Sequence, residues 1–305
     1  MTEKIYISSS ACLSAQHTFE NTEGHRIETI DTFKVTDPDY KQFIDTGALR
    51  RMNRINKFSL AVASKCLQNY HGKIDAIITA TGWGCIESTY KFLERLFDEK
   101  GLPVNPVAFI QSTHNTMAAQ IALKLKSHVY NNTITDNQSA FELALDDAIL
   151  NLHENHINNV LLGGCDEITE PLEDILKRVA MFGHPVPLGE GCTYFILSKN
   201  NTGNIATIKA FETTAENKFT DMFNKLANEH AVDYVFVQND DILSELSQVN
   251  YTTYFGNFPT VSACGLWLAV YCLNNLVQNI ASHAQNIMLV SKSKPGICYF
   301  TVVGK

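Results

Sequence analysis

Short apolar segments alternate with longer amphipathic segments along almost the whole chain, and this alternation limits the fold more than any other feature. Residues 74–84, IDAIITATGWG, form an apolar run that ends at a Gly-containing turn, which is typical of a buried strand. Residues 48–69 instead carry apolar side chains at helical spacing. Because such strands and helices interleave, the sequence predicts a layered α/β fold.

The other predicted elements continue this order. The predicted strands are 4–9, 129–135, 158–167, 192–199, 205–213, 232–238, 286–293 and 297–304. The predicted helices are 116–128, the segment after Gln138, 218–230 and 261–278. The stretch NTGN at 201–204 predicts a joint, so we expect an N-terminal half, 1–203, and a shorter C-terminal half, 204–305.

Composition excludes several classes of function. The net charge of -8 argues against sequence-independent nucleic-acid binding, which needs a basic surface. No segment approaches the roughly 18–20 consecutive apolar residues that span a bilayer. The start of the chain, MTEKIYISSSACLSA, lacks the basic and then apolar pattern of a secretory signal. We therefore expect a cytoplasmic protein with no membrane span.

The cysteine and histidine patterns argue against a metal or cofactor. The eight cysteines are scattered singly without a CxxC pair, and the ten histidines are equally dispersed. This pattern predicts buried free thiols and no metal site. Residues 74–84 also lack GxGxxG, so a dinucleotide site is a poor fit, and we expect no cofactor.

Gln138 lies at the start of a predicted helix, where free backbone N–H groups and the helix dipole stabilise negative charge. Thr135, Asp136 and Ser139 are candidate capping residues beside it. An uncharged amide makes little use of that field. Since the surrounding stretch TITDNQSAF has no cysteine, lysine or Ser–His pair, this position has no nucleophile nearby.

Five segments, in the same order, resemble those of the β-ketoacyl synthases, which have the thiolase-like fold. They are 50–67, 109–125, 158–169 with its diglycine, 188–199 with its Gly-Glu-Gly turn, and 232–238. The resemblance implies a five-layer αβαβα architecture of two similar halves, and a dimer whose interface lies beside the acyl pocket. It also implies that loops and part of the second half are truncated relative to typical condensing enzymes.

The resemblance further implies where the catalytic residues would lie. In the family, a cysteine at a helix start attacks an acyl thioester, and two histidines stabilise the enolate. The family spacing puts the nucleophile position at Gln138, and the two histidine positions at Gln238 and about Pro259. None of the three catalytic residues is present, so we expect no activity from this chain alone.

A ketosynthase homologue without these residues resembles the chain-length factors. The resemblance implies a heterodimer with an active ketosynthase, in which this chain shapes the tunnel where a polyketide or polyene grows on an acyl carrier protein. The carrier would bind through the complex. The shorter length and the Ser-Thr-His-Asn stretch at 112–115 are similar to the pairs that make aryl polyene and flexirubin-type pigments.

Two other functions stay open. A diverged synthase could condense acyl and malonyl units with a relocated nucleophile, for which Cys165 and Cys85 are the best candidates and Cys264 a third, although packing is favoured for each. A homodimeric acyl-binding module without a ketosynthase partner is the other alternative.

Two further groups of residues are candidates for contact with substrate or carrier. By resemblance, the substrate tunnel or the dimer boundary would include Phe109, Gln111, Thr113 and His114. The basic residues Arg50, Arg51 and Arg54 could attract an acidic carrier protein, but a helix start with a few ion pairs is the simpler interpretation. For Glu190, in the Gly-Glu-Gly turn, we expect bonds to neighbouring backbone.

Overall fold

The computed structural model describes residues 4–16, 18–19, 27–30, 32–68, 70–97, 106–154, 157–178, 187–238, 245–274, 280–281, 283–293 and 296–305. The strands are β1 (Ile5–Ser14), β2 (Ala76–Thr81), β3 (Tyr130–Thr135), β4 (Asn159–Asp166), β5 (Gly191–Ser198), β6 (Ala206–Ala215), β7 (Tyr234–Val237), β8 (Ser247–Asn250), β9 (Asn286–Ser293) and β10 (Ile297–Gly304). The helices are α1 (Thr46–Leu49), α2 (Arg54–Leu67), α3 (Ile86–Leu96), α4 (Pro106–Ser112), α5 (Thr116–Leu125), α6 (Ala140–Glu154), α7 (Glu170–Arg178), α8 (Phe219–Glu229), α9 (Thr252–Phe255) and α10 (Val261–Asn274). Two 3₁₀ turns, η1 (Tyr40–Gln42) and η2 (Glu216–Lys218), complete the described elements.

The described strands form one mixed ten-stranded sheet in the order β3-β2-β4-β5-β1-β6-β10-β9-β7-β8. The order 3-2-4-5-1 in one half corresponds to 8-7-9-10-6 in the other. The pairing directions correspond too: β2 is parallel to β3 and β4 as β7 is to β8 and β9, and β5 and β10 are antiparallel to their neighbours. The antiparallel pairing of β1 with β6 joins the halves. The mixed α/β class expected from the sequence is confirmed.

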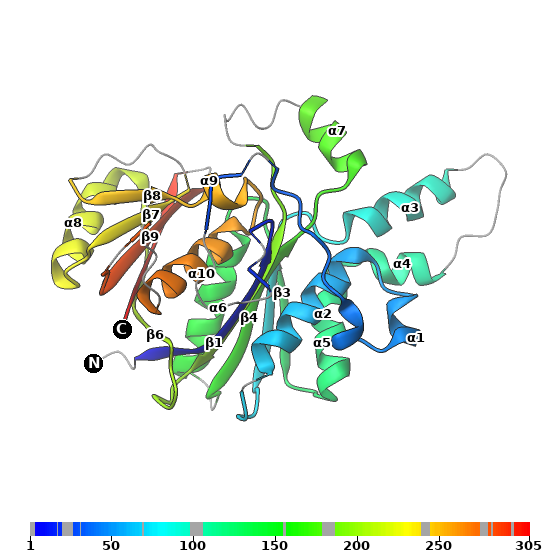
Figure 1. Ribbon diagram of the computed structural model, residues 1–305, viewed down its shortest axis with the longest axis horizontal. Coiled ribbons are helices and arrows are strands. Elements are labelled where there is room, and N and C mark those ends of the chain that lie inside the picture. The colour runs from blue at the N-terminus through cyan, green and yellow to red at the C-terminus, as the bar shows by residue number, and fades with distance from the viewer. Residues whose placement is uncertain are drawn as a thin grey trace.

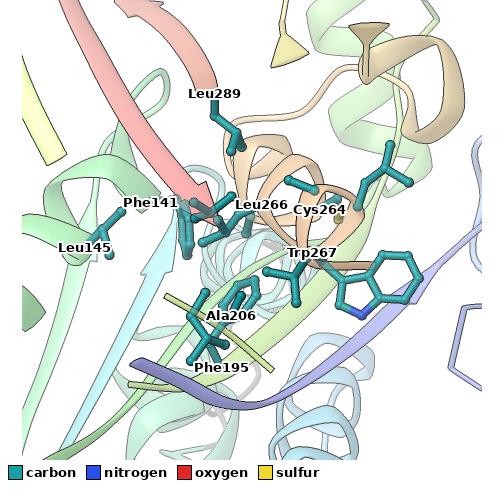
Figure 2. Close-up of a cluster of buried hydrophobic side chains, with 14 of the residues drawn as sticks. Phe141, Leu145, Phe195, Ala206, Cys264, Leu266, Trp267 and Leu289 are labelled. Atoms are coloured by element: carbon teal, nitrogen blue, oxygen red, sulfur yellow. The ribbon is translucent and has the colours of Figure 1, made fainter. Parts of the chain in front are cut away.

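Three apolar clusters fix the layers of helices around this sheet. Helices α2 and α5, with Phe58, pack on one face of the first half. Helices α6 and α10, with Phe141 and Leu266, share one core with the inner faces of both halves, as Figure 2 shows. Helix α8, with Phe223, covers the other face of the second half. In Figure 1, α6 and α10 accordingly lie between α8 on the left and α2 and α5 on the right.

Strand β2 illustrates why an uninterrupted apolar run is needed here. All six of its residues are buried. Ile77 packs in the cluster with α2 and α5, whereas Ile78 packs in the cluster with α6 and α10. A strand covered by helices on both faces has no solvent face to reserve for polar side chains.

The sequence predicts one long helix over 48–69. This prediction is wrong in one respect, because the structure has two helices there. Helix α1 ends at Leu49 and α2 begins at Arg54. The side chain of Asn53 accepts a hydrogen bond from the backbone N–H of Asn56 at 3.1 Å and so caps α2. The structure also adds elements that were not expected, namely α3, α4, α7, β8 and α9. None of the helices in the described residues is long and apolar enough to span a membrane.

The diglycine of β4 is required by close packing. A Cβ atom on Gly163 would lie 2.3 Å from the Tyr194 ring, and one on Gly164 would lie 3.0 Å from Thr260 of the α10 start. The Tyr194 ring is held in place because its hydroxyl contacts Ser59 Oγ at 2.8 Å and Thr79 Oγ1 at 2.9 Å. The diglycine therefore lets β4 approach Tyr194 on one side and α10 on the other.

Gly163→Ala should lower the free energy of unfolding by about 1–3 kcal/mol, because the added methyl group overpacks a site that cannot give way. Chemical denaturation measures this change. Gly47→Ala is the matched control, since a Cβ atom there meets nothing within 4 Å. Equal stability of the two variants would contradict the packing argument.

Candidate functional site

The turn before α6 contains Gln138, and the backbone N–H groups of Gln138 and Ser139 already donate hydrogen bonds within this turn. Asp136 Oδ1 accepts hydrogen bonds from the backbone N–H of Gln138 at 2.9 Å and of Ser139 at 2.7 Å, and from the Ser139 hydroxyl at 3.1 Å. Burial alone would raise the pKa of Asp136, but these hydrogen bonds hold it below its ordinary value. The Asp136 carboxylate thus lies at the N-terminus of α6, where the helix dipole stabilises negative charge.

Asp166 at the end of β4 joins the turn after β2 to the start of α10. Its Oδ1 accepts from the Thr81 hydroxyl at 2.8 Å and from the backbone N–H groups of Gly82 and Trp83, both at 2.9 Å. Its Oδ2 accepts from the backbone N–H of Thr260 at 3.1 Å and from its hydroxyl at 2.8 Å. Burial raises the pKa of Asp166, and these bonds offset part of that effect.

Pro259 is buried at the point where three turns meet. A Cβ atom on Gly82 would lie 2.2 Å from Pro259 Cβ and 3.0 Å from the carbonyl oxygen of Asp136. The turns after β2, before α6 and before α10 are therefore adjacent. Gln138 and Pro259, which are far apart in sequence, come to one region of the molecule.

Gln238 lies directly after β7, in the other half of the sheet. Its carbonyl oxygen accepts a hydrogen bond from the Thr252 hydroxyl at 3.2 Å, which fixes the start of α9. From there the chain runs through α9 and Gly256, at φ 75°, to Pro259. Gln238 is thus linked by this hydrogen bond to the segment that ends at Pro259. The side chains at the three positions, two amides and a proline, offer neither a nucleophile nor a general base.

The candidate nucleophiles among the cysteines are inaccessible. All eight cysteines are free and buried, as expected from the sequence. Burial raises the pKa of Cys85 to about 12 and holds the pKa values of Cys165 and Cys264 well above the ordinary value. Because the thiolate is the nucleophile, a raised pKa disfavours nucleophilic attack by these three thiols at neutral pH. Among the described residues there is also no group of three or more metal-ligating side chains.

The tunnel candidates lie on one exposed segment at the end of α4 and the start of α5. The Phe109 side chain is 55% exposed. The Gln111 side chain donates to the Arg51 carbonyl, and the Thr113 hydroxyl donates to the Ile110 carbonyl at 3.0 Å. The exposed His114 packs against Gly84, where a Cβ atom would lie 2.1 Å from its ring. Of these four residues, Gln111 also borders a cleft of about 460 Å³.

The three arginines near the start of α2 differ in role. Arg50 and Arg51 are exposed and, with Lys57, Lys91 and Arg95, border a cleft of about 460 Å³. Arg54 instead forms an ion pair with Glu190, which is 1% exposed, with Nη1–Oε2 at 2.7 Å and Nη2–Oε1 at 2.8 Å. For Arg54 the ion-pair interpretation is confirmed.

Glu190 also bonds to backbone, as the sequence suggested. It accepts from the backbone N–H groups of Val35 and Ile168, both at 2.9 Å. Through Glu190, the Gly-Glu-Gly turn therefore joins the start of α2 to the backbone at Val35 and at Ile168. The arginine partner was missed because it lies 136 residues away in sequence.

Glu190→Ala should lower the free energy of unfolding by about 3 kcal/mol or more, since it leaves a half-buried guanidinium and two backbone donors without their acceptor. Asp37→Ala removes the exposed partner of the same guanidinium, 2.9 Å from Arg54 Nε, and should cost less than about 1 kcal/mol. Denaturation of both variants tests this. A larger loss for Asp37→Ala would show that the buried pair is not the anchor.

Comparison with solved structures shows the same fold in ketosynthases. The ishigamide ketosynthase/chain length factor matches with a TM-score of 0.78 at 13% identity, over 99% of each chain. AntDE:AntF, a type II PKS acyl-carrier protein in complex with its ketosynthase bound to the hexaketide, matches with a TM-score of 0.79 at 15% identity, also over 99% of each chain. A β-ketoacyl synthase from Burkholderia phymatum STM815 gives 0.72 at 13%, again over 99% of each chain.

No curated protein matches the chain significantly in sequence. The family model described as "Beta-ketoacyl synthase, N-terminal domain" matches residues 32–188, just over half of the chain. These residues include the turn of Gln138, the diglycine and Asp166. The chain therefore belongs to the β-ketoacyl synthase family and has its thiolase-like fold.

Proposed function

We propose that this chain is a catalytically silent ketosynthase homologue of the chain-length-factor type. It forms a heterodimer with an active β-ketoacyl synthase and shapes the tunnel in which a polyketide or polyene is elongated on an acyl carrier protein. Gln138 occupies the nucleophile position, and Gln238 and Pro259 the histidine positions. Aryl polyene and flexirubin-type pathways are the product class we favour.

The turn before α6 carries this proposal. Acyl transfer at residue 138 needs a nucleophile and N–H donors for the developing oxyanion. Residue 138 is an amide, and its N–H donates to Asp136 at 2.9 Å. The Asp136 carboxylate, which the same bonds keep ionised, would also repel an oxyanion beside it. Both requirements fail at the same turn.

The edge of the sheet offers a surface for the partner. In the described part of the chain, β3 pairs only with β2, so one side of its backbone is open. Four apolar side chains around it are exposed, which we name the β3 face: Leu123, Tyr130, Leu143 and Leu150. Leu143 and Leu150 flank Asp147, which accepts from the Tyr130 hydroxyl at 3.1 Å. An open edge strand with apolar neighbours is suited to association with a second subunit.

The domain division belongs to the same proposal. We retain two thiolase-like halves, 1–203 and 204–305, because the two halves of the sheet share one strand order and one set of pairing directions. The alignments to the ketosynthase structures cover 99% of both chains.

The proposal predicts activity only in a complex. We expect this chain, co-expressed with an active ketosynthase from the same pathway, to co-purify with it, and the complex to extend acyl carrier protein with malonyl units. Gln138→Ala should leave the rate within about twofold, because the amide takes no part in the chemistry. Replacing the partner's nucleophilic cysteine should abolish elongation.

Elongation by this chain alone would overturn the proposal and point to a relocated nucleophile. A thiol-directed ketosynthase inhibitor of the cerulenin type would then label one of its cysteines. Mass spectrometry of the isolated chain distinguishes the two cases, since the buried thiols should remain unlabelled.

The β3 face predicts which variants break the complex. The double variant Leu143→Glu and Leu150→Glu should weaken association at least about thirtyfold. Each substitution places a charge in the interface where the complex would bury a leucine, and the two together should cost about 2 kcal/mol or more of binding free energy. Ile175→Glu is the matched control, since Ile175 is 52% exposed on α7. Size-exclusion chromatography and titration of the purified subunits measure the effect. Equal weakening by both variants would exclude the β3 face as the interface.

A further inference from the structure

A small cavity lies between the two central helices and the second half of the sheet. Its volume is about 10 Å³, about that of a single water-sized probe. Four apolar side chains line it and are seen in Figure 2: Phe141 and Leu145 of α6, Leu266 of α10 and Leu289 of β9. The remaining lining is polar and consists of Glu142, Tyr251, Ser262, Ser291, Tyr299 and Thr301.

Three polar atoms at this cavity have no hydrogen-bond partner within the described part of the chain. They are Glu142 Oε2, the Tyr251 hydroxyl and Ser262 Oγ. Their side chains are 4%, 0% and 6% exposed. The other carboxyl oxygen, Glu142 Oε1, accepts from the Ser291 hydroxyl at 2.6 Å. Buried polar atoms without a partner are costly, so three of them around one cavity indicate a bound polar ligand.

Among the described residues, no positively charged side chain lies beside Glu142 at the cavity. None of the residues that line the cavity is basic. The titratable groups that face it are Tyr251, Tyr299 on β10 and, through electrostatic interaction, Asp136 at the start of α6. Burial raises the pKa of Glu142, and the Asp136 charge acts in the same direction, while the nearby Ser291 and Ser262 hydroxyls and the backbone of Glu142 offset part of the rise. The Ser262 hydroxyl is thus near the carboxyl group but is not in hydrogen-bond geometry with it. A buried carboxyl in such surroundings favours its neutral form.

We propose that this cavity is a binding site for one water molecule and that Glu142 faces it as a neutral carboxylic acid. The acid donates its proton in a hydrogen bond to the water, and the water in turn bonds Tyr251 and Ser262. A water molecule with three such partners is well satisfied. The site links α6, four residues after Gln138, to α10, three residues after Pro259.

The proposal predicts how stability depends on pH. Below the ordinary pKa of glutamic acid, Glu142 is protonated in both the folded and the unfolded chain, so its contribution is constant. As the pH rises through that range, the unfolded chain ionises while the folded chain stays neutral. The unfolding equilibrium constant then rises about tenfold per pH unit until the folded pKa is reached.

Glu142→Gln should remove this part of the slope, because the amide keeps a donor for the water and does not titrate. At neutral pH the variant should therefore have a higher free energy of unfolding than the parent chain. At pH 4 it should have no such advantage. Glu229→Gln, at an exposed position of α8, is the control and should leave the stability unchanged both at neutral pH and at pH 4. Asp166 and Glu167 are also buried carboxyls with raised pKa values, so the difference between parent and variant is the quantity to compare. A Glu142→Gln variant that is less stable than the parent at neutral pH would overturn the proposal.

Infrared spectroscopy tests the protonation directly in the full chain. At neutral pH the parent should show a protonated-carboxyl C=O band that disappears in Glu142→Gln, and Ser291→Ala should shift this band because it removes a hydrogen bond to the same group. If Glu142→Gln does not fold, the Ser291→Ala shift alone decides. A crystal structure should show one ordered water within hydrogen-bond distance of the three oxygens. A spectrum unaltered by both variants, or no such water, would overturn the assignment.

Discussion

The buried carboxylate of Asp166 is the interaction on which the arrangement of the site depends. It comes from the end of β4, and all five of its bonds go to the turn after β2 or to the start of α10. The turn after β2 belongs to one half of the sheet, whereas α10 follows β8 and α9 of the other half. Because Pro259 precedes Thr260, the same bonds also fix Pro259 against Gly82 and the turn of Gln138. Burial raises the pKa of Asp166, and the surrounding donors offset part of that rise, so the fully buried carboxyl group is not left unsatisfied.

The two central helices, α6 and α10, are buried to different extents. Helix α6 has one face against the sheet and another, with Leu143 and Leu150, exposed beside β3. Helix α10 is buried at nearly every position, because it lies between both halves of the sheet and α6. An apolar surface all around a helix of this length is stable only in such a place. Of these two helices, α6 is therefore the one that presents large apolar side chains to solvent.

Much of the fold could be predicted from the sequence, since strands such as 74–84 are buried on both faces and show it in their composition. The capping role of Asp136 also followed from local pattern. The break at Asn53 could not be predicted, because apolar residues continue on both sides of it and only the side-chain cap ends the helix. The Arg54–Glu190 pair and the Asp166 bonds join segments 136 and about 80–95 residues apart, so only the folded chain reveals them. The cavity at Glu142 could not be predicted for the same reason, because its polar side chains come from α6, α10, β9, β10 and the turn before α9.

Under the silent-subunit proposal, the chain keeps the fold of the β-ketoacyl synthases while the reacting groups belong to the partner. If the chain served only to bind a partner, the turns around Asp166 could vary freely once the β3 face was preserved. Instead, the diglycine, the Gly-Glu-Gly turn and Asp166 are each held by close contacts that leave little tolerance. Such precision is needed when a subunit must present a fixed wall to a reactive growing chain, since a shift of one turn would admit water or alter the depth of the tunnel. In that arrangement Asp136 stabilises the start of α6 with a fixed negative charge, and the chemistry is left to the partner.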